Sequence, residues 1–126
     1  MRIVISTSSV EPIYQQIQLQ VVQAIMAGDL HEGDMLPSLR SLAKELRISV
    51  LTVTRAYTEL EQDGYVENIQ GKGCFVLGNG MELVRDKLIE DVKGHLEQAV
   101  DLARKAGLNR AEFLQMLRME ELNDEN

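Results

Sequence analysis

The stretch LPSLRSLAKELRISVLTVTRAYTELEQDG, residues 36–64, predicts two short amphipathic helices separated by a tight break at RIS, residues 47–49. Apolar residues recur at helical spacing in both halves. Ser38 and Ser49 stand where N-terminal caps are expected, and Gly64 is placed to end the second helix. Two helices joined by so short a turn are typical of the helix-turn-helix, whose second helix can enter the major groove of DNA.

The flanking residues extend this pair into a winged helix. Residues 1–11 read as extended or loose, and Pro12 can open a helix whose apolar stripe ends before Gly28. That stripe comprises Tyr14, Ile17, Val21, Ala24 and Ile25. Downstream, YVENI (65–69) and CFVL (74–77) read as two strands, with QGKG (70–73) as their turn. Three helices followed by a hairpin form the winged-helix arrangement.

A helical tail follows a short GNG hinge at 78–80. Residues 81–106 predict one long helix with an apolar seam, and Asn109 with Glu112 predicts a capping box for a last helix. Phe113, Met116 and Leu117 should give that helix an inward face. We therefore expect a mainly α fold with a small β-hairpin wing. Residues 1–79 form the winged helix-turn-helix domain (core 12–77), and 80–126 form a two-helix C-terminal tail. The residues of this tail that can pack against another helix are Leu88, Val92, His95, Leu96, Ala99, Leu102 and Ala103.

The composition excludes several classes of protein and leaves DNA binding open. The 126-residue chain has a net charge of −7, but residues 38–55 carry four basic side chains against one acidic one. Local charge can outweigh distant opposite charge because salt screens beyond about 8–10 Å. Cys74 is the only cysteine, which fits a reducing cytoplasm. No membrane span, signal peptide, metal-ligand set, cofactor motif or catalytic constellation is evident. We expect a cytoplasmic protein that is not an enzyme and needs no metal or cofactor.

The residues suited to contacting DNA lie on the outer side of the helix pair and at the hairpin tip. Short hydroxyl side chains suit base edges, basic side chains suit phosphates or guanine, and glycines permit close backbone approach. The candidates are Ser38, Arg40, Ser49, Thr52, Thr54, Arg55, Gly71, Lys72 and Gly73.

Each candidate also has a purely structural explanation. The two serines serve as caps with or without DNA, and Thr52 can satisfy its own helix end. Arg40 or Lys44 can pair with Glu45, and the two glycines can be turn residues alone. The apolar seam can be an ordinary helix interface in which His95 is simply packed.

The motif LPSxRxLAxxLxISxxTVxRAYxxLExxGYVxxxxGKGxFV, residues 36–76, preceded by PIYQQI at 12–17, resembles the GntR family of bacterial transcription regulators. The resemblance covers about residues 12–77 and implies a recognition helix at about 49–63 in the major groove and a wing tip at 71–73 at the minor groove. Many members have arginine where this chain has Val50 or Thr54, which shifts the expected arginine contact to Arg55. The short tail is similar to that of the YtrA-like subfamily, which implies that residues 80–126 are a dimerisation tail and that the apolar residues of the seam form the dimer interface.

The resemblance implies a homodimeric repressor of an operon such as one encoding an ABC transporter. Its partner would be a double-stranded operator with two-fold symmetry, and a small-molecule effector remains open. The alternative is a winged-helix protein-interaction module without specific DNA binding.

Overall fold

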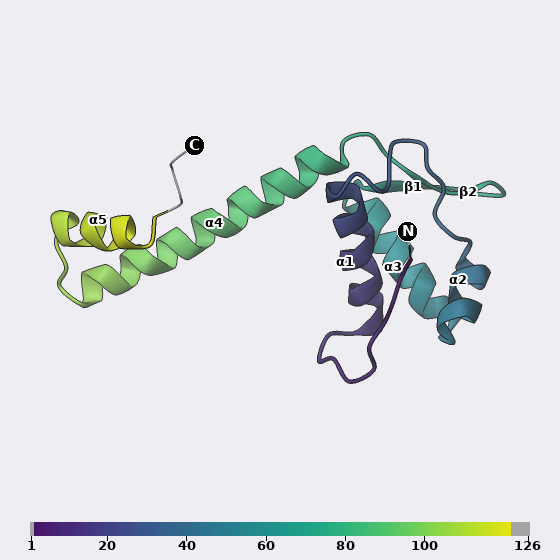
Figure 1. The fold of residues 1–126 in the computed structure, drawn as a ribbon, viewed down its shortest axis with the longest axis horizontal. Coiled ribbons are helices and arrows are strands. Elements are labelled where there is room, and N and C mark those ends of the chain that lie inside the picture. Colours follow the sequence, from purple (N-terminus) through teal and green to yellow (C-terminus); the bar gives the residue numbers. More distant parts are fainter. Residues whose placement is uncertain (1, 122–126) are drawn as a thin grey trace. The chain divides into compact units, whose positions relative to one another are not determined.

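The computed structural model describes residues 2–121, which divide into two compact units with the boundary between Asp86 and Lys87. The elements run α1 (Ile13–Met26), α2 (Leu39–Leu46), α3 (Val50–Gln62), β1 (Val66–Ile69), β2 (Gly73–Val76), α4 (Gly80–Lys105) and α5 (Arg110–Met119). The first unit is a three-helix core with a hairpin beside it (Figure 1). The predicted mainly α fold with a hairpin wing is confirmed. None of the helices within residues 2–121 combines the length and apolarity needed to cross a bilayer.

The core of the first unit forms where the apolar faces of α1, α2 and α3 meet. α1 and α3 pack along each other, and α2 crosses the start of α3. The predicted inward residues of α3 are all buried: Val53, Ala56, Tyr57 and Leu60. Burying each large apolar side chain stabilises the fold by roughly 1.5–3 kcal/mol. The apolar stripe of α1 is buried as well, except that Tyr14 is half-buried at its edge.

The hairpin forms an antiparallel pair in which Val66 faces Val76 and Ile69 faces Gly73. Val66, Cys74 and Val76 turn toward the core, as the alternation of a half-buried strand predicts. The segment before α2 adds a short third pairing that the sequence analysis missed. Met35 forms an isolated bridge with Phe75, and the Leu36 N–H donates to the Cys74 carbonyl at 2.8 Å. The wing is therefore tied directly to the entry of the helix pair.

Residues 1–11 were expected to be extended or loose; residues 2–11 contain no helix or strand, but their first half is held against the core. Ile3 is buried in the core, and two glutamines of α1 hold the backbone around it. The side-chain amide of Gln16 accepts from the Ser6 N–H at 2.8 Å and donates to the backbone carbonyls of Ser6 and Glu11. The side-chain amide of Gln20 accepts from the Val4 N–H and donates to the Val4 carbonyl. These side-chain amides replace the backbone partners that an extended segment otherwise lacks.

The tail is helical as predicted, and Asn109 and Glu112 form the expected capping box at the start of α5. The start of α4 belongs to the first unit, because Val84 is buried in its core. A Cβ at Gly80 would lie only 2.8 Å from Cγ2 of Ile25.

The predicted inward face of α5 is wrong for a single chain: Phe113 is half-buried, but no residue of α5 is fully buried. Within residues 87–121, α5 finds too little apolar surface to cover that face.

Candidate nucleic-acid interface

The turn between α2 and α3 is set by two serine caps and one strained residue. Ser38 Oγ accepts from the Ser41 N–H and Ser49 Oγ from the Thr52 N–H, each at 3.1 Å. Arg47, between the helices, has φ 58° and ψ 46°, the left-handed region that non-glycine residues avoid. It is the only non-glycine residue with positive φ among those described. The sharp reversal lets two helices meet within three intervening residues.

The hydroxyl groups at the start of α3 already have partners within the helix. Ser49 Oγ lies 2.8 Å from Thr52 Oγ1, and Thr54 Oγ1 donates to the Val50 carbonyl at 2.9 Å. Ser49 therefore caps the helix and Thr52 contributes to the same helix end, as their structural explanation proposes. These roles remain compatible with a contact to DNA. Both threonines are half-buried.

Arg55 has an intramolecular role that the sequence analysis did not foresee. Its Nε donates to Glu59 at 3.0 Å, and one terminal nitrogen donates to the Tyr14 hydroxyl at 3.1 Å. The guanidinium also lies over the Tyr14 ring, 3.8 Å from its centroid. Hydrogen bonds from Gln18 and Arg55 lower the pKa of Glu59. The side chain thus joins α1 to α3, and a DNA contact through Arg55 would compete with these bonds.

The wing tip is a tight turn closed by a hydrogen bond from the Lys72 N–H to the Ile69 carbonyl at 3.0 Å. Gly71 and Gly73 have φ of 79° and 131°, so both positions require glycine for conformational reasons. Next to this turn in β1, the Asn68 N–H donates to the Glu61 carboxylate at 2.8 Å, a bond that lowers the pKa of Glu61. This carboxylate therefore fixes the wing to α3.

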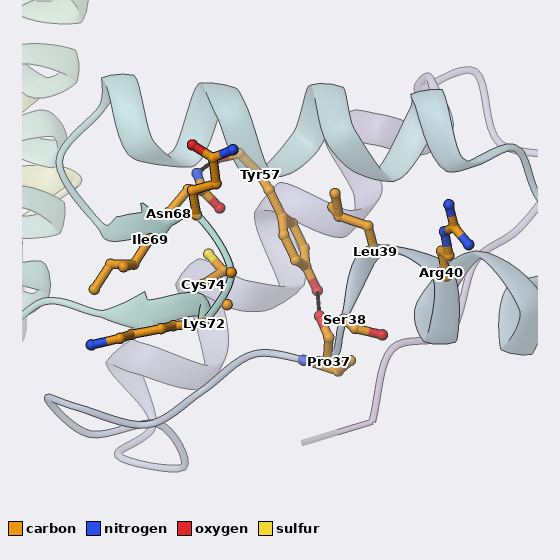
Figure 2. Close-up of a pocket in the computed structure, with 12 residues that line it drawn as sticks. Pro37, Ser38, Leu39, Arg40, Tyr57, Asn68, Ile69, Lys72 and Cys74 are labelled. Atoms are coloured by element: carbon orange, nitrogen blue, oxygen red, sulfur yellow. Dashed lines mark hydrogen bonds between the residues drawn. The ribbon is translucent and has the colours of Figure 1, made fainter.

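A hollow of about 480 Å³ separates the start of α2 from the wing (Figure 2). Tyr57 crosses its floor and donates its hydroxyl to the Pro37 carbonyl at 2.8 Å. Five of the nine predicted contact residues line the hollow: Ser38, Arg40, Gly71, Lys72 and Gly73. Arg40 and Lys72 lie at its opposite ends (Figure 2). The other four predicted contacts lie outside it, on α3 and its cap.

Burial affects the two titratable groups beneath the hollow. It raises the pKa of the Cys74 thiol to about 12, and it raises the pKa of Tyr57 further above its ordinary value. Both groups therefore remain neutral at physiological pH. A protonated, buried thiol is a poor nucleophile.

Four basic side chains of α2, the turn and the wing form no ion pair in the part of the chain that the structure describes, whereas Glu59 and Glu61 both accept hydrogen bonds. Within residues 2–121, Arg40, Lys44, Arg47 and Lys72 form no ion pair, and Glu45 pairs with neither neighbour proposed for it. Glu59 and Glu61 accept the hydrogen bonds described above. The exposed edge formed by α2, the turn and the wing tip is thus basic in a chain that is acidic overall. No cluster of metal-ligating side chains occurs among the residues described.

The sequence matches the model of the GntR family of bacterial regulatory proteins over residues 13–76, about half of the chain. The chain belongs to the GntR family. It is 34% identical over 104 residues to the transcriptional repressor YtrA of Bacillus subtilis, covering 82% of this chain and 80% of that protein. Among solved structures, YtrA of Sulfolobus acidocaldarius, a GntR-family transcription factor, is 36% identical with a TM-score of 0.63 over 75% of this chain and 97% of that one.

A third similarity concerns the fold alone. The DNA-binding domain of AraR, solved in complex with its operator ORX1, is 22% identical with a TM-score of 0.54 over 60% of this chain and 95% of that chain. The resemblance to the GntR family and its YtrA-like subfamily is therefore confirmed, and similarity to YtrA extends beyond the winged helix into the tail.

The tail of this GntR protein displays an apolar surface to solvent. Leu88, Val92, Leu96 and Leu102 of α4 are each between 44% and 65% exposed. His95 is exposed and Ala99 half-buried, whereas Ala103 is buried within the chain and has little surface left for a partner. On α5, the exposed large apolar residues are Leu114, Met116, Leu117 and Met119. So much apolar surface on a small helical unit is unusual for a protein that remains a monomer.

Proposed function

We propose that this chain is a sequence-specific DNA-binding repressor that acts as a cytoplasmic homodimer. α3 enters the major groove, the wing tip at 71–73 follows the minor groove, and the tail pairs with its copy. The observation that carries this proposal is the basic edge, in which Arg40 and Lys72 lie free at the two ends of one hollow. The operator complex of the AraR DNA-binding domain supports DNA binding by this fold, because the two domains share it.

The contacts to DNA divide into two groups by their chemistry. Arg40, with the free N–H groups at the start of α2, suits one phosphate, and Lys72 suits another at the wing. Ser49, Thr52 and Thr54 line the face of α3 that would meet base edges. Arg55 acts chiefly as a positioning residue that holds α3 against α1, since its donors to Tyr14 and Glu59 are already used.

Dimerisation through the tail is supported by the exposed apolar residues of α4 and α5. Pairing would bury side chains that a single chain leaves in water, at roughly 25 cal/mol per Å² of apolar surface. Two copies bring two recognition helices, so the operator should have two-fold symmetry with half-sites about 10 bp apart or a multiple of that distance. Repression of a transporter operon is proposed from the resemblance to the YtrA-like subfamily alone.

A band shift on DNA from upstream of the chain's own gene tests the binding. Arg40→Ala should weaken binding to every duplex and lower the salt slope by about one for each phosphate that the side chain no longer neutralises. Arg110→Ala on α5 is the control and should change neither quantity. Absence of a shift at low salt would refute the proposal and favour a protein-interaction module instead.

Sedimentation at micromolar concentration tests the dimer. Leu96→Glu on α4 should yield a monomer, because the pairing would bury a charge. Leu19→Glu on α1, at a residue of similar exposure, is the matched control and should leave the dimer intact. A monomeric wild-type chain would contradict this part of the proposal.

A further inference from the structure

The start of α3 exposes two apolar side chains that none of the predicted DNA contacts includes. Leu51 is 80% exposed and Val50 is 41% exposed, and neither contributes to the core. The helix has its own buried face in Val53, Ala56 and Leu60, so these two residues are not required for packing. Exposed leucine in the first turn of the helix that would meet DNA needs a separate explanation.

The polar side chains near Leu51 already form hydrogen bonds within the protein. Ser49 and Thr52 bond each other, Thr54 bonds the Val50 carbonyl, and Arg55 bonds Tyr14 and Glu59. Their capacity to discriminate between bases by new hydrogen bonds is correspondingly reduced. The groups that remain fully available at this helix end are the methyl groups of Val50 and Leu51.

The charge around these residues identifies the partner as a polyanion. Arg47 precedes α3 by three residues, Arg40 and Lys44 lie on the adjoining α2, and none of the three forms an ion pair within the described part of the chain. A protein partner for two apolar residues does not require this cationic border, whereas the DNA backbone does. In the major groove, the C5-methyl of thymine is the apolar group that a base pair presents.

We propose that Leu51, together with Val50, reads thymine by contact with its C5-methyl group. The inference rests on the proposed function and deepens it, because it names the base and the chemical group that are recognised. Thr54 lies three and four residues beyond Leu51 and Val50, so the three share one helical face. The face would favour T·A pairs at adjacent positions of each half-site, without an arginine fork to guanine.

Uracil-substituted DNA tests this inference, since uracil lacks only the C5-methyl. Wild-type protein first selects its site from a random duplex library, and each thymine of that site is then replaced by uracil in turn. At one or two positions of each half-site, we expect affinity to fall about fourfold for each methyl group removed. The affinities are measured by fluorescence anisotropy at one salt concentration.

The variants assign the effect to the side chain. Leu51→Ala should bind the thymine and uracil duplexes equally at its position, and Val50→Ala should do so at a neighbouring one. Val10→Ala, at a fully exposed apolar residue outside the helix pair, should keep the full preference for thymine. Both alanine changes of α3 lie at exposed positions, so the fold is retained.

Each outcome separates the two proposals. If the library yields a site but uracil binds as well as thymine, or if Leu51→Ala keeps the full uracil penalty, methyl readout is overturned and DNA binding stands. If no site is enriched, the proposed function fails and this inference fails with it.

Discussion

Removing the Tyr57 hydroxyl should reveal how much the start of α2 depends on α3. In Tyr57→Phe the ring stays in the core, where it is 2% exposed, and only the 2.8 Å bond to the Pro37 carbonyl is removed. A hydrogen bond of this kind contributes about 0.5–1.5 kcal/mol, and a fully buried orphaned acceptor costs about 1–3 kcal/mol.

The hollow beside Tyr57 decides between these magnitudes. Because it is about 480 Å³ in volume and lined by the hydroxyl's own neighbours, water can reach the freed carbonyl. We therefore expect a loss near the lower value, about 1 kcal/mol. For a unit of this size that corresponds to a fall in Tm of roughly 4–8 °C.

Thermal unfolding followed by circular dichroism at one fixed protein concentration provides the measurement. Tyr65→Phe is the matched control, because Tyr65 is also buried but no hydrogen bond from its hydroxyl occurs within residues 2–121. It should change Tm by less than half as much. Equal effects of the two variants would refute the reasoning, since the Pro37 bond would then contribute nothing. Tyr57→Phe should also weaken DNA binding slightly, because Ser38 and Arg40 follow Pro37 directly.

Three further predictions concern stability, measured as the free energy of unfolding in urea. Gly80→Ala should destabilise the fold by about 1–3 kcal/mol, because its Cβ meets the side chain of buried Ile25. Gly94→Ala has open space around it and should stabilise the fold by about 1 kcal/mol. A change of the same sign in the free energy of unfolding for both variants would contradict this reasoning. Arg47→Gly should raise the free energy of unfolding by about 0.5 kcal/mol, because it relieves left-handed strain of roughly 1 kcal/mol and part of that gain is offset by the greater freedom of glycine in the unfolded chain. Glu45→Gly inside α2, where no such strain exists, should lower the free energy of unfolding by about 1 kcal/mol. Burial raises the pKa of Cys74 to about 12, so the folded chain keeps the thiol neutral at pH values where the unfolded chain ionises it. The stabilisation from the neutral thiol is therefore complete below the ordinary thiol pKa and is lost as pH rises from about 8.5 toward 12, at up to about 1.4 kcal/mol per pH unit. Cys74→Ala should flatten the pH dependence of the free energy of unfolding below about pH 10, and an unchanged slope would exclude Cys74 as its cause.

The local features of the fold could be predicted from the sequence because their causes lie within a few residues. Ser38, Ser49 and Asn109 cap helices through bonds to residues three positions away, and Gly64 ends α3 with a positive φ. The buried stripe of α3 follows from helical periodicity alone. The hairpin follows equally from two short strands around a glycine-rich turn.

The features that were missed depend on contacts between distant residues. Tyr14 and Arg55 are 41 residues apart, so no periodicity connects them. The hollow likewise needs the start of α2 beside a wing more than thirty residues later. One signal was present for Gln16: it precedes Gln20 and the buried Ala24 by steps of four, which places it on an inward-facing row. The predicted contacts with DNA and between copies of the chain remain predictions.

The separation of free cations from engaged carboxylates bears on how the protein would meet its target. Residues 1–86 carry seven basic and eleven acidic side chains, so most faces of this unit repel a phosphate backbone. An approach with the basic edge forward is attractive, whereas most other orientations are repulsive over a Debye length. Encounters are thereby oriented before contact. An overall acidic charge is in this way compatible with a selective search of DNA, because it suppresses binding in the wrong pose.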